Sequence, residues 1–220
     1  MLIRAHGIRF PMTGYFVTGT DTNVGKTVLS ALLVAALDAV YWKPVQTGAS
    51  EGTDRESVRV WSEVSEDRLP LERYRFHRPV SPHLASREGG MRIALDDFEL
   101  PEAPAGLRWI VEGAGGVLVP LNERDLMRDL MQRIGFPVIV AARTALGTIN
   151  HTLLTLAALR EARLPICGVV LIGKKNVENR SAIERYGKVS VVGHIPILEQ
   201  INRAALLEVY EKRFNHGAFE

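Results

Sequence analysis

Short apolar runs rich in β-branched residues alternate with helical patterns along the whole chain. The apolar runs have the length of strands, and the segments between them repeat apolar residues at the spacing of one helix face. We predict strands at residues 15–18, 40–44, 109–112, 137–141, 166–171 and 189–193. We predict helices at residues 26–38, 55–64, 124–134, 148–162, 179–186 and 204–214. Repeated strand–helix units of this kind are typical of a doubly wound α/β fold with a mainly parallel sheet.

Residues 65–107 interrupt the alternation, because they are rich in proline and charge and have no clear period. We predict that this segment folds over one edge of the site. Residues 1–11 are predicted to be an N-terminal extension without assigned function, since Met12 stands three residues before the first predicted strand. A chain of 220 residues suits one substantial core, so we expect a single domain over residues 12–220.

The composition is that of an ordinary globular protein, with 46% hydrophobic and 24% charged residues. Lysine and arginine number 27 against 25 for aspartate and glutamate, a surplus too small to indicate a nucleic-acid partner. The basic residues Arg73, Arg75 and Arg78 are predicted to form a solvated face rather than an anion site. No apolar stretch is long enough to span a bilayer, and no secretory leader opens the chain. We therefore expect no nucleic acid, no membrane and a cytoplasmic location.

The single cysteine, Cys167, excludes an intramolecular disulfide and a thiolate metal cluster within one chain. It lies in the apolar run 166–172, so we predict a buried small hydrophobe rather than a catalytic thiol. The six histidines show no zinc-ligand spacing. These observations favour a reducing compartment.

The first predicted strand runs into the loop GTDTNVGKT at residues 19–27, which opens an apolar-periodic helix. Strand, loop and helix stand in the order of a P-loop. Backbone N–H groups in such a loop surround phosphate oxygens, Lys26 adds a cation, and Thr27 offers a hydroxyl to magnesium. Five residues instead of the usual four separate the two glycines, so Thr20 stands where the first glycine is expected. The alternative is a polar turn without a ligand.

Three further polar residues stand near the ends of predicted elements. Lys43 lies at the carboxyl end of the second strand, where its ammonium would point into the phosphate crevice; alone, it would be a solvated lysine. Glu112 ends the third strand, where P-loop enzymes place a magnesium-coordinating carboxylate; the alternative is a capping carboxylate. Asp54, taken alone, is most simply a helix N-cap. Thr27, Asp54 and Glu112 together supply three oxygens for one metal ion.

The fourth predicted strand leads to LGTINH at residues 146–151, at the start of another helix. Unpaired N–H groups there suit a carboxylate. His151 lies within that helix and is equally a candidate core or surface histidine, so no function is assigned to it.

Together these motifs resemble the dethiobiotin synthetase family. The resemblance covers about residues 14–200 and is carried by VTGTDT at 17–22, VGKT at 24–27, KPV at 43–45, TG at 47–48, SPH at 81–83, VEGAGG at 111–116 and LGTINH at 146–151. The KPV and EGAGG runs are specific when they follow such a loop in that order.

The resemblance implies an ATP-dependent cyclo-ligase that converts 7,8-diaminononanoate and carbon dioxide into dethiobiotin in biotin biosynthesis, giving ADP and phosphate. It implies Mg²⁺ as cofactor and a homodimer with active sites at the interface. One amine would capture carbon dioxide as a carbamate stabilised by Lys26 and Lys43. The carbamate would attack the γ-phosphorus of ATP, and the second amine would attack the resulting carbamic-phosphoric anhydride.

The resemblance also implies the residues of the site. Catalytic roles fall to Lys26 and Lys43. Contacts to ATP are implied for Asn23, Val24, Gly25, Lys26, Thr27, Val28, Asp54, Glu112, Gly113, Ala114, Gly115, Pro196, Ile197 and Leu198. Contacts to the substrate are implied for Thr22, Lys43, Thr47, Gly147, Thr148, Ile149 and Asn150, of which the last four would come from the partner subunit. The metal ligands would be Thr27, Asp54 and Glu112.

Two departures concern the nucleotide. Ile172 and Gly173 stand where well-known members have an Asn-Asp pair whose asparagine reads adenine, so either Asn176 substitutes or base preference is relaxed. The GHIP-like turn of the family is present at residues 193–196, so we expect the C-terminal wall of the base pocket to be retained. Asn23 replaces a glutamate found in some members.

Three other classes are less well supported. A partitioning or maturation switch ATPase would place a second lysine at the start of the loop, where this chain has residues 20–22 without one. An amide-forming ligase usually receives ammonia from a glutaminase, but Cys167 lies in a predicted strand and no glutaminase domain fits in this chain. A binding module that had lost catalysis is disfavoured because Lys26, Thr27, Lys43, Asp54 and Glu112 are all present.

Overall fold

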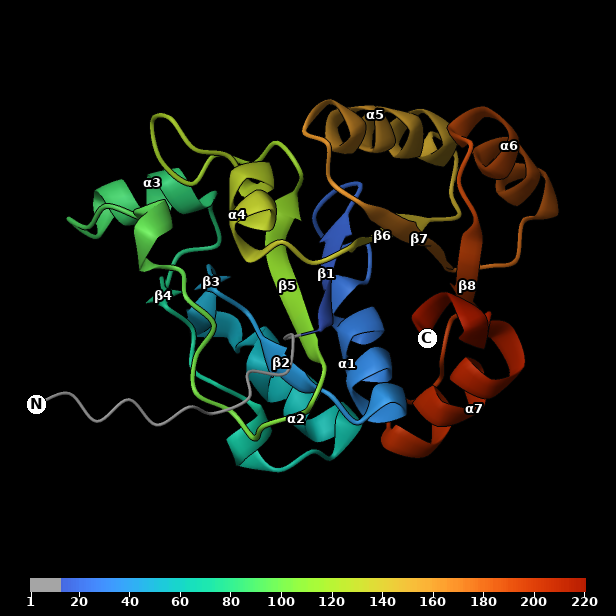
Figure 1. Cartoon of the computed structure of the whole chain (residues 1–220), viewed down its shortest axis with the longest axis horizontal. Helices are drawn as coiled ribbons and strands as arrows, with labels where there is room; N and C mark the ends of the chain where they lie inside the picture. The colour runs from blue at the N-terminus through green and yellow to red at the C-terminus, as the bar shows by residue number, and fades with distance from the viewer. Residues whose placement is uncertain (1–12) are drawn as a thin grey trace, which may run out of the picture.

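A six-stranded sheet forms the centre of the computed structural model, which describes residues 13–220 (Figure 1). The strand order is β2-β5-β1-β6-β7-β8, and every neighbouring pair is parallel. The strands are β1 Gly14–Gly19, β2 Val40–Trp42, β5 Trp109–Gly116, β6 Val138–Arg143, β7 Ile166–Ile172 and β8 Val191–Ile195. The predicted fold class is confirmed. The predicted extension, residues 1–11, lies outside the described residues.

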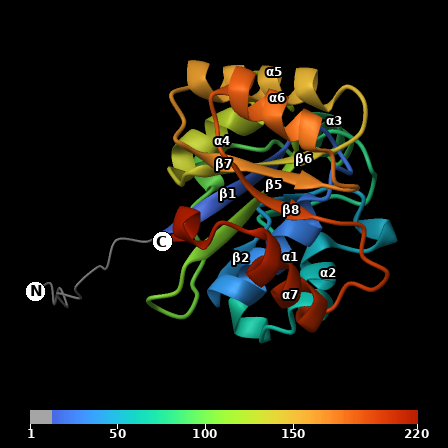
Figure 2. The same ribbon diagram turned by 90° about the vertical axis from the view of Figure 1, so that its right-hand side faces the viewer.

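Helices cover both faces of the sheet (Figure 2). One layer contains α1 Lys26–Leu37, α2 Asp54–Ser62 and α7 Arg203–Arg213. The other contains α3 Pro82–Glu88, α4 Met127–Ile134, α5 Thr148–Glu161 and α6 Val177–Gly187. Because a parallel sheet is covered on both faces, its strands read as continuous apolar runs.

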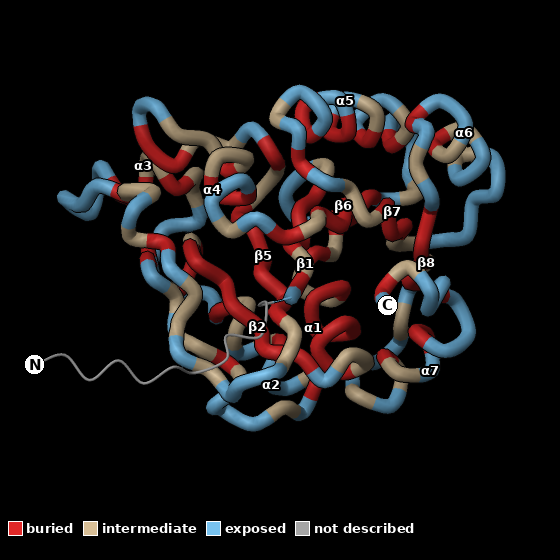
Figure 3. The backbone as a smooth tube through the Cα atoms, in the orientation of Figure 1, coloured by how far each residue is buried: buried red, intermediate tan, exposed pale blue. Residues whose placement is uncertain are grey.

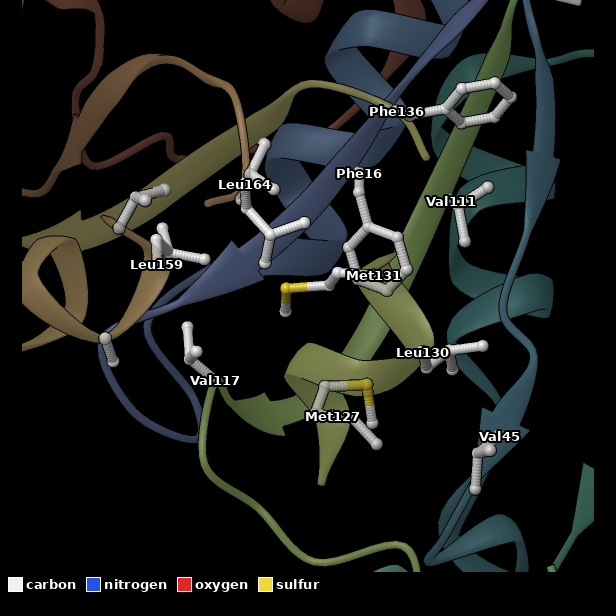
Figure 4. Close-up of a cluster of buried hydrophobic side chains, with 14 of the residues drawn as sticks. Phe16, Val45, Val111, Val117, Met127, Leu130, Met131, Phe136, Leu159 and Leu164 are labelled. Atoms are coloured by element: carbon white, nitrogen blue, oxygen red, sulfur yellow. The ribbon is translucent and has the colours of Figure 1, made fainter. Parts of the chain in front are cut away.

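The core consists of two clusters that the sheet separates. Successive side chains of a strand point to opposite faces, so Phe16 packs with Val111 and Met131 on the α4 side, whereas Val17 packs on the α1 side. Figure 4 shows Phe16 beside Met131, with Val111 on the neighbouring strand β5. Figure 3 shows that buried residues follow the strands and the inner faces of the helices. The core therefore holds the carboxyl ends of β1, β2 and β5 rigidly side by side.

All twelve predicted elements are present, but several boundaries differ. The predicted strand 40–44 ends at Trp42, because Pro44 has no N–H for a sheet; β3 (Val45–Gln46) instead pairs with β4 (Tyr74–Arg75) in a separate two-stranded sheet. Helix α4 begins at Met127 rather than at residue 124. Strand β8 begins at Val191, two residues later than predicted, and β5 continues to Gly116.

The segment 65–107 contains regular elements that its sequence did not indicate. Besides β4 and α3 it has 3-10 turns at Glu66–Arg68 and Leu95–Asp97, and further 3-10 turns lie at Ala49–Glu51 and His216–Phe219. The three arginines predicted to form a solvated face are exposed. No helix within residues 13–220 is both long and apolar enough to cross a membrane.

Candidate active site

A cavity of about 780 Å³ opens at the carboxyl ends of β1, β2 and β5. Its walls come from the phosphate loop, the segment between β2 and α2, the end of β5 and residues 79–82. Most of the predicted site residues line it, namely Thr22, Asn23, Gly25, Lys26, Thr27, Val28, Lys43, Thr47, Asp54, Glu112, Ala114 and Gly115. Since residues 79–82 belong to the segment 65–107, that segment does border the site, as predicted.

The phosphate loop ends at Gly25, the N-cap of α1, whose backbone is left-handed with φ 100° and ψ 23°. This positive φ favours glycine, and a Cβ at the position would also lie 2.8 Å from Cδ1 of Ile172. The next residue, Lys26, is 7% exposed, and its Nζ donates to the backbone carbonyl of Asp21 at 3.0 Å. Burial lowers the pKa of Lys26, and the opposing attraction of Glu112 does not fully compensate. The loop thus presents a desolvated cation beside the helix N-terminus.

Lys43 lies between two carboxylates at the centre of the site. Its Nζ is 2.5 Å from Asp54 Oδ2 and 2.9 Å from Glu112 Oε1, and the Lys43 and Glu112 side chains are 5% and 0% exposed. Burial alone would lower the pKa of Lys43, but Glu112 and Asp54 outweigh it and hold that pKa above its ordinary value. Burial likewise opposes ionisation of Asp54, yet Lys43 holds the Asp54 pKa below its ordinary value. Lys43 and Asp54 are therefore both charged at neutral pH.

Thr27 completes a set of converging oxygens. Its Oγ1 lies 2.8 Å from Asp54 Oδ1 and 3.1 Å from Glu112 Oε1, and a single hydroxyl proton can bond only one of them at a time. Hydroxyl and carboxylate oxygens of this kind are ligands that Mg²⁺ accepts. Within residues 13–220 no group of three or more His, Cys, Asp or Glu side chains is placed to hold a metal ion, so a cation here would depend on the hydroxyl and on substrate or water oxygens.

The alternative interpretation of Asp54 as a helix N-cap, which applied to the residue taken alone, is wrong. The N-cap of α2 is Thr53, whose Oγ1 accepts from Glu56 N at 3.1 Å while Glu56 Oε2 accepts from Thr53 N at 2.9 Å. This capping box satisfies the first turn of the helix without Asp54. As the first residue of α2, Asp54 keeps its carboxylate free to contact Lys43 and Thr27.

Two buried residues of the site were not singled out in the sequence. Tyr41 donates through its hydroxyl to Glu112 Oε2 at 3.1 Å, and burial raises the pKa of Tyr41 well above its ordinary value, so the phenol remains a donor. Gln46 accepts from Asp54 N at 3.1 Å and donates to Thr47 O at 2.7 Å. The sequence could have indicated Tyr41, because it stands two residues before Lys43 and side chains two residues apart in an extended chain point to the same face.

Several predicted residues do not line this cavity. Val24 is 2% exposed and belongs to the core, and Gly113 packs against Phe16 and Met127. The residues after β8 and at the start of α5 also lie outside the lining, namely Pro196, Ile197, Leu198, Gly147, Thr148, Ile149 and Asn150. His151 is exposed on α5.

The region after β7 has its own hydrogen bonds. Gly173 donates from its N–H to Ile195 O at 2.9 Å, and its carbonyl lies 2.8 Å from His194 Nε2. Asn176, the candidate for base recognition, is the N-cap of α6, and its Oδ1 accepts from Asn179 N at 2.9 Å. The side-chain oxygen of Asn176 is therefore already engaged in capping a helix.

Cys167 is half-buried in β7 rather than fully buried. Its Sγ donates to Ala218 O at 3.3 Å, and burial raises its pKa to about 11. A thiol of this kind is a poor nucleophile at neutral pH, in agreement with the prediction that it is not catalytic.

Comparison with known proteins places the chain among nucleotide-dependent enzymes. Residues 13–205 match the family described as an AAA domain. The protein from Rhodopseudomonas palustris (strain BisB18), named ATP-dependent dethiobiotin synthetase BioD, is 44% identical over 203 residues, covering 92% of this chain and 96% of that protein. The protein of the same name from Paramagnetospirillum magneticum (strain ATCC 700264 / AMB-1) is 48% identical over 195 residues, covering 89% of this chain and 93% of that protein.

Two solved structures share the fold. A putative plasmid partition protein from Borrelia burgdorferi B31 bound to AMPPNP has a TM-score of 0.54 at 13% identity, covering 91% of this chain and 98% of that one. A nucleotide-binding protein from Archaeoglobus fulgidus in complex with ADP has a TM-score of 0.50 at 14% identity, covering 95% and 91%. At such low identity, the likeness concerns the fold alone.

Proposed function

The chain belongs to the family of ATP-dependent dethiobiotin synthetases, and on that basis we propose that its cavity converts 7,8-diaminononanoate, carbon dioxide and ATP into dethiobiotin, ADP and phosphate. The observation that carries the proposal is the buried cluster of Lys43, Asp54 and Glu112 directly beside Thr27 of the phosphate loop. A charged group of this kind, at the carboxyl edge of a parallel sheet, lies where such folds bind and react their ligands.

ATP would bind along the loop that runs into α1. The unpaired N–H groups of the helix N-terminus and the side chain of Lys26 favour the anionic phosphates. Contacts are proposed for residues 23–28 and, at the end of β5, for Glu112 to Gly115. Residues 196–198, after β8, are proposed to lie at the base of the nucleotide.

The first bond forms between one substrate amine and carbon dioxide, giving a carbamate and releasing a proton. Lys26 and Lys43 stabilise its negative charge, and Thr22 and Thr47, which line the same cavity, orient it. A carbamate oxygen then bonds to the γ-phosphorus of ATP as the bond to the ADP oxygen breaks. The second amine attacks the carbonyl carbon, phosphate leaves with the anhydride oxygen, and the ring closes with loss of another proton.

Thr27, Asp54 and Glu112 are proposed to hold Mg²⁺, which, when bound, supplies positive charge to the phosphate oxygens. The fit rests on the donor set: one hydroxyl and two carboxyl groups bring three oxygens together, of the kind that Mg²⁺ accepts. Lys43 remains charged within this cluster because both carboxylates raise its pKa. At neutral pH the Lys43 ammonium can therefore interact with the carbamate.

We further propose that the active site is completed by a second copy of the chain. Residues 147–150 do not line the cavity of their own chain, and they begin α5, a helix of 14 residues. The N-terminus of such a helix attracts a carboxylate, which the diamine substrate carries at its far end. Residues 79–82 and this second copy would together keep water from the reactive anhydride.

The free thiol of Cys167 agrees with a location in the reducing cytoplasm.

The test is ADP release with diamine, bicarbonate, ATP and Mg²⁺, omitting each component in turn and identifying the product by mass. Lys43→Ala should abolish product formation, whereas Lys212→Ala, which removes an exposed lysine of α7, should leave it unchanged. Consumption of ATP that does not depend on the diamine would instead indicate a switch ATPase with the same fold.

A further inference from the structure

The pairing of β2 with β5 places Tyr41 beside Glu112. Tyr41 lies opposite Ile110 in the register of the two strands, and Glu112 follows Ile110 by two residues. Because side chains alternate between faces, Tyr41 and Glu112 point to the same side of the sheet, as does Lys43 two residues after Tyr41. Glu112 is therefore flanked on one face by a phenol and an ammonium from the neighbouring strand.

These two neighbours contact different oxygens of the carboxylate. The Tyr41 hydroxyl donates to Oε2 at 3.1 Å, whereas Oε1 lies 2.9 Å from Lys43 Nζ and 3.1 Å from Thr27 Oγ1. Tyr41 and Glu112 are both 0% exposed, so bulk water cannot replace the phenol. Oε2 faces the core and Oε1 faces the cavity.

A glutamate needs such a partner to hold one orientation. Its terminal torsion has a broad and nearly two-fold distribution, so rotation of the carboxylate is not determined by packing alone. A buried acceptor that loses its only donor also carries a desolvation penalty. The Tyr41 ring is held in turn by the α1-side core, where it packs with Leu29, Val58 and Ile110, which makes it a rigid support.

We propose that Tyr41 is a positioning residue that fixes the Glu112 carboxylate with Oε1 directed at Thr27 and the cation site. This inference rests on the proposed function, because it concerns the orientation of a proposed magnesium ligand. Partners that orient a metal ligand in this way typically contribute 10–100-fold to metal affinity or activity. Tyr41 itself touches neither substrate nor metal.

The experiment is a titration of Mn²⁺ into the full chain saturated with ADP, followed by electron paramagnetic resonance. Tyr41→Phe removes only the hydroxyl and should weaken Mn²⁺ binding by about ten-fold. The matched control is Tyr74→Phe, because Tyr74 is also a buried tyrosine that donates to a carboxylate, that of Asp97, and Asp97, unlike Glu112, does not line the cavity. The control should bind Mn²⁺ as the wild type does.

Enzyme kinetics give a second readout that a purely structural role would not change. With Tyr41→Phe, the Mg²⁺ concentration for half-maximal ADP release should rise by about the same ten-fold factor, while the rate at saturating Mg²⁺ stays close to that of the wild type. Equal Mn²⁺ affinities and equal Mg²⁺ requirements in wild type and Tyr41→Phe would overturn the inference and leave the proposed function intact. A wild-type chain that binds no Mn²⁺ with ADP would overturn both.

If Tyr41→Phe does not fold, the test uses 3-fluorotyrosine at position 41 in the otherwise native chain. Its ¹⁹F resonance should shift when Mg²⁺ is added to the ADP complex, because the charge on Glu112 is then shared with the cation. The same label at position 74 should not shift. A resonance at position 41 that is unchanged by Mg²⁺ would overturn the inference.

Discussion

Lys43 and Glu112 form a buried ion pair across β2 and β5, with Nζ 2.9 Å from Oε1 and side-chain exposures of 5% and 0%. The pair follows directly from the strand register, in which Trp42 lies opposite Val111, one residue before each partner. Burying two charges is costly, and such pairs contribute little net stability compared with apolar packing. Their presence beside the phosphate loop therefore indicates a chemical role rather than a structural one.

Removing the ammonium should destabilise the fold. Lys43→Met leaves the carboxylates of Asp54 and Glu112 without their shared cation, and breaking a buried pair in this way typically costs about 3–5 kcal/mol. The free energy of unfolding in urea should fall accordingly and recover in part with Mg²⁺, because a ligand that binds only the folded state stabilises it. Lys212→Met, at an exposed site, should stay within about 0.5 kcal/mol of wild type. An unchanged stability of Lys43→Met would contradict the role of the ammonium in this cluster.

Stability should depend on pH through Asp54. Burial raises its pKa, but Lys43 outweighs burial and holds the pKa below the ordinary value of 3.8. The pKa of Asp54 is lower in the folded chain than in the unfolded chain. Ionised Asp54 therefore contributes fully to the free energy of unfolding above about pH 4, and this contribution is lost as the pH falls through the folded-state pKa. The urea midpoint of wild type should therefore decline more steeply below this pH than that of Asp54→Asn. The exposed Asp96→Asn variant should follow wild type; parallel curves for Asp54→Asn and wild type would refute the expectation.

Gly25→Ala should impair both folding and nucleotide binding. A left-handed backbone costs an alanine about 1–2 kcal/mol, and the new Cβ would lie 2.8 Å from Ile172 Cδ1. The loop, whose N–H groups are proposed to surround the phosphates, must shift to relieve this contact. ADP affinity, measured by calorimetry, should therefore fall about ten-fold, which corresponds to about 1.4 kcal/mol of binding free energy. Gly135→Ala is the matched control, because Gly135 has φ 76° but no neighbour within 4 Å of its Cβ. The Gly135→Ala variant should lose stability but keep its affinity for ADP. If both variants lost ADP affinity equally, the contact between residue 25 and Ile172 would not be the cause.

Cys167 should be unreactive in the folded protein. A pKa of about 11 leaves roughly 0.1% thiolate at pH 8, so a disulfide reagent should modify the folded chain far more slowly than the chain in urea. Cys167→Ala should retain diamine-dependent ADP release. Fast labelling of the folded chain together with loss of activity would point to thiol chemistry and against the ligase mechanism.

The proposed dimer can be tested on α5. Leu154 is 62% exposed on this helix, and Leu146, just before it, is fully exposed. Leu154→Glu should shift the sedimentation profile towards monomer and lower diamine-dependent ADP release, while affinity for ADP is retained. Val60→Glu introduces the same charge at a site of 57% exposure on α2 and should leave the assembly unchanged. A dimer that withstands the Leu154 change would place the interface elsewhere.

Local signals account for the parts of the fold that were predicted correctly. The alternation of apolar runs with helical periods indicated the sheet and its helices, because burial on each face imposes these periods. The capping box Thr53-x-x-Glu56 was also readable as a local motif, and it would have excluded Asp54 as the N-cap of α2. The break at Pro44 follows from its missing N–H, yet the pairing of β3 with β4 does not, since the partner strand lies 29 residues along the chain from Val45 to Tyr74.

Local patterns were enough to predict the fold class, the phosphate loop and the location of Lys43 and Glu112 near one edge of the sheet, because the parallel strands of a doubly wound sheet end at a common edge. Which atoms meet at that edge follows from the folded chain alone. Tyr41 and Glu112 are separated by 71 positions, and their contact depends on the register of β2 against β5, which short-range patterns do not specify. The partners of the charged cluster therefore depend on long-range strand register and on the burial that this register produces.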